Sequence, residues 1–224
     1  MTTNNKKLFL LLGTTLFTQA TTSLVGGLIG FGPRFDTSNT ASALNSIASN
    51  IGGVYIGIFL QLVTALVIVA LAAAFYQAGK GINKTVAIIA FGFYITETVV
   101  HIVTQIVTFA LSATAAQFAA GGDASLLTIG EILLRTREFC GAITMMPFGL
   151  GAILFYYLIT KSKVLPKWLG GYGIITVSFI LVGWSLQAFG VPFPFALYVP
   201  YVPFEWVAGV YIFIKGTIIE KGTN

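Results

Sequence analysis

The chain has 224 residues, of which 56% are hydrophobic and 8% are charged, and its mean hydropathy is +0.90. About 25% of the residues in a soluble domain are charged, so this composition excludes a soluble globular protein and predicts an integral membrane protein. The net charge of +5 does not indicate a nucleic-acid partner, because the basic residues are scattered singly between apolar runs. Cys140 is the only cysteine, which excludes an intramolecular disulfide and a multi-cysteine metal site.

A helix needs about 20 residues to cross the hydrocarbon core of a bilayer, and six apolar segments reach or approach that length. They are Leu8–Gly30, Ile51–Gln77, Thr85–Ser112, Leu127–Thr160, Leu169–Phe189 and Leu197–Ile214. We therefore predict an all-α integral membrane protein with one domain, residues 1–224, built as a bundle of six transmembrane helices. The first span is expected to be uncleaved, because its apolar run continues to Phe31 with no soluble domain after it.

The lysines predict the orientation of these spans. They are Lys6, Lys7, Lys80, Lys84, Lys161, Lys163, Lys167, Lys215 and Lys221. In a six-span topology all of them fall on one side, which the positive-inside rule makes cytoplasmic. Both termini are therefore expected in the cytoplasm, and the protein is expected in the cell membrane.

The first outer loop contains a polar stretch, Thr37–Ser49, that is rich in small residues and predicts a short surface helix. Asp36 is the expected cap, because its carboxylate can accept hydrogen bonds from the free amides of a first turn.

Two further sequence features concern helix packing. The pairs Gly26/Gly30 and Gly53/Gly57 have the small-xxx-small spacing that lets membrane helices approach closely. Pro147 lies inside the long fourth span and lacks a backbone donor, so the sequence predicts a kink or local unwinding there.

Several segments in the second half of the chain resemble one family. They are Phe148-Gly149-Leu150-Gly151, Tyr157-Leu158-Ile159, Ser162 and Leu165-Pro166-Lys167-Trp168-Leu169-Gly170. The chain resembles the bacterial "domain of unknown function 4386" family of multi-pass membrane proteins. The resemblance implies a six-helix inner-membrane protein and supplies no established activity or catalytic residues. Many members carry an arginine early in the third span, where this chain has Tyr94, with Glu97 after it.

Ionisable residues inside membrane spans are costly, so they usually form pairs or serve a function. Residues at i, i+3 and i+4 share a helix face. In the third span this face carries Tyr94, Glu97, His101, Thr104, Gln105 and Thr108, and in the fourth it carries Glu131, Arg135 and Glu138.

Depths along the helices predict which of these groups meet. At 1.5 Å per residue, Glu97 lies about 18 Å from the cytoplasmic end of its span, and Glu138 about 16 Å from the outer end of the next. We therefore predict a polar cluster in the outer half of the bundle, with Arg135 held by Glu138 and Glu97. His101 is expected at its margin and Glu131 near the outer surface.

Glu205 lies near the outer start of the sixth span, after a proline-rich stretch, residues 191–203, that makes a poor continuous helix. This stretch has two interpretations: an aromatic cover over the polar cluster, or an ordinary interfacial aromatic belt.

The chemistry of the cluster stays open at this stage. Glu97 and His101 could form a metal pair, a proton relay or a structural hydrogen-bonded pair, but two ligands alone do not predict a metal or another cofactor. Arg135 with Glu131 and Glu138 fits an ion-pair network, and with Arg137 it fits an anion site.

These residues support three functions: a small transport or ligand-binding protein, a non-catalytic membrane subunit or scaffold, and a membrane-embedded enzyme acting on a lipid-type substrate. No nucleophile constellation is evident, so catalysis is not expected. The lipid bilayer is the expected partner, other membrane subunits are a further option, and no nucleic acid is expected.

Overall fold

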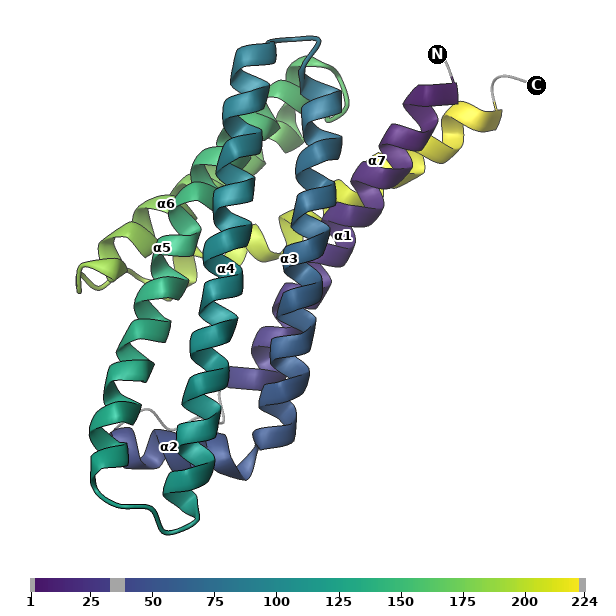
Figure 1. Cartoon of the computed structure of the whole chain (residues 1–224). Helices are drawn as coiled ribbons and strands as arrows, with labels where there is room; N and C mark the ends of the chain where they lie inside the picture. The colour runs from purple at the N-terminus through teal and green to yellow at the C-terminus, as the bar shows by residue number, and fades with distance from the viewer. Residues whose placement is uncertain (1–2, 33–38, 222–224) are drawn as a thin grey trace.

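The computed structural model describes residues 3–32 and 39–221, and this part of the chain is built from helices (Figure 1). The elements are α1 (Thr3–Phe31), α2 (Thr40–Ser49), α3 (Ile51–Gly79), α4 (Lys84–Ala119), α5 (Ser125–Lys161), α6 (Lys167–Ala188), the 3₁₀ turns η1 (Phe195–Leu197) and η2 (Val199–Tyr201), and α7 (Val202–Lys221). The predicted all-α class is confirmed.

The helices pack in the order α7, α1, α3, α4, α5 and α6. The start of α1, the end of α7 and the turns α3–α4 and α5–α6 all lie at one end of the molecule, while α2 crosses the other end (Figure 1). The lysine-bearing segments are therefore together, as the sequence predicts; we call this the lysine end. The side of a membrane that this end faces stays a prediction.

Among the described residues, five helices are long and apolar enough to cross a membrane: α1 from Lys6 onward, α3, α4, α5 and α6. Each contains or closely overlaps one of the first five predicted spans. The sixth predicted span is only partly correct, since α7 begins at Val202 rather than Leu197 because prolines interrupt the preceding segment. α7 is not among the five, so a sixth span stays a proposal.

The predicted surface helix is present as α2, and Leu44 and Ile47 bury its apolar side. Its cap is Asn39, whose side-chain oxygen accepts a hydrogen bond from the Ser42 amide at 2.8 Å. Asp36, the cap that we expected, lies outside the described residues.

Pro147 lies inside α5, which is helical from Ser125 to Lys161. The local unwinding that the sequence allowed is therefore not seen. Because proline lacks an amide hydrogen, the carbonyl of Ile143 has no helical donor from this position. The kink stays a prediction.

Glycines set the closest helix contacts. A Cβ atom on Gly57 would lie 2.8 Å from the Cα atom of Gly30 and 2.9 Å from the carbonyl of Gly26. The predicted close approach at these glycines is confirmed, and it joins α1 to α3. A Cβ atom on Gly13 would lie 2.7 Å from the carbonyl of Gly209, so α1 and α7 are just as close.

The helix lengths show which residues lie at the same depth. α6 has 22 residues and α5 has 37, so at 1.5 Å per residue they are about 33 Å and about 55 Å long, against about 30 Å for a hydrocarbon core. Thr104, Gly141 and Gln187 each lie about 20 residues, or about 30 Å, from the lysine end of their helix. The first half of α5 thus extends well past the end of α6.

Candidate functional site

Two buried glutamates from different helices line one cavity of about 190 Å³. Glu97 comes from the middle of α4 and Glu205 from the first turn of α7, and their exposed fractions are 4% and 7%. The two carboxylates interact electrostatically. We call this space the glutamate cavity. Its other lining residues are Gln19, Ala20, Ser23, Leu24, Thr64, Ile68, His101, Met145, Phe148, Ile180, Trp184, Tyr201, Val202 and Trp206.

Local sequence explains both positions. Glu97 follows Tyr94 by three residues and precedes Thr104 by seven, so the helical repeat places all three on the buried face of α4. Glu205 follows Pro203 in the first turn of α7, where a proline loses no helical hydrogen bond and an acidic group interacts well with the helix dipole.

A chain of hydroxyl groups connects α5 to Glu205. The Tyr156 and Tyr201 hydroxyls are 2.7 Å apart, and the Tyr201 hydroxyl donates to Glu205 Oε1 at 2.9 Å. Because Tyr201 uses its hydrogen on the carboxylate, Tyr156 donates to Tyr201. Tyr94 packs against this group, and its hydroxyl interacts electrostatically with Tyr156 and Glu97. All three tyrosines are nearly or fully buried.

A second polar chain joins α4 to α3 and α1. His101 Nε2 and Gln61 Oε1 are 3.1 Å apart, and Gln61 Nε2 donates to the Ser23 carbonyl at 3.1 Å. Since the amide oxygen of Gln61 faces the histidine, Nε2 of His101 carries the hydrogen in this arrangement. The chain holds the His101 ring at the wall of the glutamate cavity.

The negative charges in this cavity are not compensated by protein cations. Among the described residues, no lysine or arginine forms an ion pair with Glu97 or Glu205, and Glu97 Oε2 accepts no hydrogen bond. Two like charges in one cavity repel each other, and burial costs several kcal/mol for each ion. The pair is therefore suited to hold a proton or another cation.

A metal fits these residues less well. Glu97 and His101 both line the cavity, but the described residues contain no group of three or more histidine, cysteine or acidic side chains that could hold a metal ion.

The predicted partners of Arg135 are wrong. Arg135 Nη2 lies 2.9 Å from Glu131 Oε1, and their side chains are 77% and 52% exposed. Glu131 is therefore the one member of the expected ion-pair network that holds Arg135, and neither Glu97 nor Glu138 does so. For Glu97 the physical reason is depth, because Arg135 lies about 39 Å from the lysine end and Glu97 about 20 Å.

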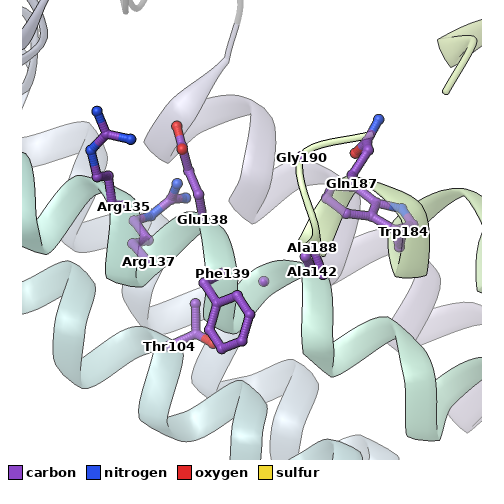
Figure 2. A pocket seen from close by; sticks show the side chains of 11 residues that line it. Thr104, Arg135, Arg137, Glu138, Phe139, Ala142, Trp184, Gln187, Ala188 and Gly190 are labelled. Carbon is purple, nitrogen blue, oxygen red and sulfur yellow. The ribbon is translucent and has the colours of Figure 1, made fainter. Parts of the chain in front are cut away.

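A second cavity, of about 610 Å³, lies between α4, α5 and the end of α6 and is lined by Arg135, Arg137 and Glu138 (Figure 2). We call it the arginine cavity. Its lining residues are Thr104, Arg135, Arg137, Glu138, Phe139, Gly141, Ala142, Trp184, Gln187, Ala188 and Gly190. Trp184 lines both cavities, so the two polar sites adjoin at this side chain.

Sequence reasoning missed several residues of the glutamate cavity. Gln19 and Gln61 are lone amides inside apolar runs, which is the signal that could have identified them. Tyr156 was not predicted as part of the site, and Tyr201 was predicted only as part of the proline-rich stretch. That stretch turns inward, because Tyr198 and Tyr201 are buried and Tyr198 stacks on Trp184 at 5.7 Å.

Helices long and apolar enough to cross a membrane, packed around buried ionisable residues, define a multi-pass membrane protein. The chain belongs to the family described as "Domain of unknown function (DUF4386)", which matches residues 10–216. The predicted family is therefore confirmed. Neither a comparison with curated proteins nor a comparison with solved structures found a match.

Proposed function

We propose that this protein binds a small organic cation in the glutamate cavity, in exchange for a proton shared by Glu97 and Glu205. The observation that carries the proposal is the pair of buried carboxylates, from α4 and α7, to which no lysine or arginine of the described residues is ion-paired. Either a proton or a bound cation removes their repulsion, so the two compete for one site.

The walls of the cavity favour an organic cation. Phe148, Trp184, Tyr201 and Trp206 surround the carboxylates, and aromatic rings attract an ammonium group by cation–π interaction. The volume of about 190 Å³ restricts the ligand to a small amine. An inorganic cation does not need an aromatic lining for binding, because oxygen ligands are sufficient.

The place of the cavity supports a transport role. We place the protein in a bacterial cytoplasmic membrane with six spans and both termini in the cytoplasm, which puts Glu97 about 20 Å from the cytoplasmic end of α4. Pro147 follows Met145 and precedes Phe148, which both line the cavity. A proline at this depth supplies a point where α5 can bend as the site changes access.

Calorimetry on the protein in nanodiscs tests the binding reaction. Methylammonium, trimethylammonium and tetraethylammonium are titrated in two buffers of different ionisation enthalpy, so that released protons are counted. We expect about one proton released for each small amine bound, and binding weakened about tenfold or more in Glu97→Gln and in Glu205→Gln. Glu131→Gln, at an exposed position, is the matched control. Absence of amine binding, or equal binding by all three variants, contradicts the proposal.

A purely structural role is the competing function, and the Tyr156–Tyr201–Glu205 chain favours it. The two functions differ in the stability of a Glu97→Gln/Glu205→Gln double variant. Replacing both carboxylates by amides removes their repulsion and the cost of burying charge, so a cation site predicts a double variant at least as stable as the unmodified protein. A structural lock predicts a less stable double variant.

A further inference from the structure

With the lysine end at one edge of the hydrocarbon core, the arginine cavity lies at the level of the opposite edge. Gly141, Gln187 and Thr104 line it, and each is about 30 Å from the lysine end, which is the thickness of the hydrocarbon core. Lipid headgroups occupy this level. A cavity of about 610 Å³ here is large enough for a headgroup.

Arg137 is held in place but keeps binding capacity. Its Nε–H donates to Thr108 Oγ1 at 3.2 Å, and its guanidinium lies 3.6 Å from the centre of the Phe31 ring. No carboxylate among the described residues forms an ion pair with it. A guanidinium has five N–H donors in a planar fork that matches phosphate oxygens. Arg137 lines the cavity, and no ion pair to its terminal nitrogens is seen among the described residues, so we expect them to bind an anion there.

Arg135 and Glu138 contribute differently. Arg135 is already paired with Glu131. Glu138 lines the same cavity and interacts electrostatically with Arg137, without a close ion pair (Figure 2). A simple anion would be attracted by Arg137 and repelled by Glu138. A group with a phosphate and a nearby ammonium would satisfy both residues.

The surroundings of the cavity are apolar. The Phe139 side chain lines it and is 48% exposed, and Phe189, next to Gly190 in the wall, is 77% exposed. Both lie about 33 Å from the lysine end, at the same edge of the hydrocarbon core as the cavity. A soluble phosphate compound gains nothing from these rings, whereas a lipid buries them.

We propose that the arginine cavity binds the phosphate of a phospholipid headgroup through Arg137, and that Glu138 selects headgroups carrying an ammonium group. This site does not depend on cation binding in the glutamate cavity. The proposed ligand is a zwitterionic phospholipid, and its site borders the glutamate cavity at Trp184.

The test measures binding of short-chain phospholipids to the purified protein in detergent. Dihexanoyl lipids with ethanolamine or glycerol headgroups are compared with dihexanoylglycerol, free phosphoethanolamine and inorganic phosphate. We expect the ethanolamine lipid to bind most tightly. Arg137→Gln should weaken its binding about tenfold or more, and Glu138→Gln should remove the preference over the glycerol lipid. Lys84→Gln, at an exposed position at the lysine end and outside the cavity lining, is the control and should change binding little.

Two results overturn the proposal. Equal binding of the ethanolamine lipid by the Arg137→Gln variant and the unmodified protein removes Arg137 as the ligand. Equal binding of free phosphoethanolamine and the lipid removes the lipid as the source of the phosphate. If Arg137→Gln does not fold, the unmodified protein decides, because binding dihexanoylglycerol as tightly as the phospholipid excludes a phosphate site.

Discussion

Replacing Tyr201 by phenylalanine removes one oxygen from the middle of the hydroxyl chain. Tyr201 donates to Glu205 and accepts from Tyr156, at 2.9 Å and 2.7 Å, in a buried region. A hydrogen bond to a charged group contributes about 1.5–3 kcal/mol, and a stranded buried donor costs about 1–3 kcal/mol. Because the tyrosine ring is retained and some relaxation occurs, we expect Tyr201→Phe to lower the free energy of unfolding by about 2–4 kcal/mol.

Reversible unfolding in mixed micelles, with increasing denaturing detergent, measures this loss. Tyr172→Phe is the matched control, since the Tyr172 hydroxyl donates to the Pro200 carbonyl at an exposed position. The control should lose about 1 kcal/mol or less. Equal small losses in the two variants would refute the hydroxyl chain as a stabilising element. A Tyr201→Phe/Glu205→Gln double variant should lose less than the sum of the single losses.

Three further predictions concern topology, packing and a loop. Ser162→Cys, in a chain without its native cysteine, should resist an impermeant thiol reagent added outside cells; reaction would reverse the proposed topology. Gly57→Ala should destabilise the fold by about 1–3 kcal/mol by separating α1 from α3, while Gly52→Ala, with nothing within 4 Å of its Cβ, should not. Hydrogen bonds from Ser125 lower the pKa of Asp123 below its ordinary 3.8, so Ser125→Ala should raise this pKa in an NMR titration. The stabilisation from this loop is present above pH 3.8 and lost as the pH falls through the folded-state pKa.

Much of the fold follows from one-dimensional signals in the sequence. Runs of apolar residues identify the helices that can cross a membrane, because a bilayer demands about 20 such residues in a row. The spacing of glycines predicts the α1–α3 contact, since small residues allow close backbone approach. The start of α7 is harder to predict, because the segment before it is apolar but interrupted by prolines.

The helix face of a site residue could be predicted from the sequence, but its depth relative to other helices could not. The helical repeat places Tyr94, Glu97 and His101 on one side of α4, and the structure brings Glu205 to them. Depth is not encoded in the same way, because α5 continues past the end of α6 without a change in its helical pattern. Arg135 was therefore assigned to partners at another depth, whereas Arg137 was predicted only as one possible ligand of an anion site.

We propose that Glu97 and Glu205 share one cation, which is a proton when no ligand is bound. Infrared spectroscopy of the protein in nanodiscs at pH 7 measures this directly, since a protonated carboxyl group has a carbonyl stretch that a carboxylate lacks. We expect one such band, from a buried carboxyl group, in the ligand-free protein. It should be absent from the Glu97→Gln/Glu205→Gln double variant and should disappear when a small amine binds. A spectrum of the ligand-free protein without such a band would contradict a proton shared by Glu97 and Glu205.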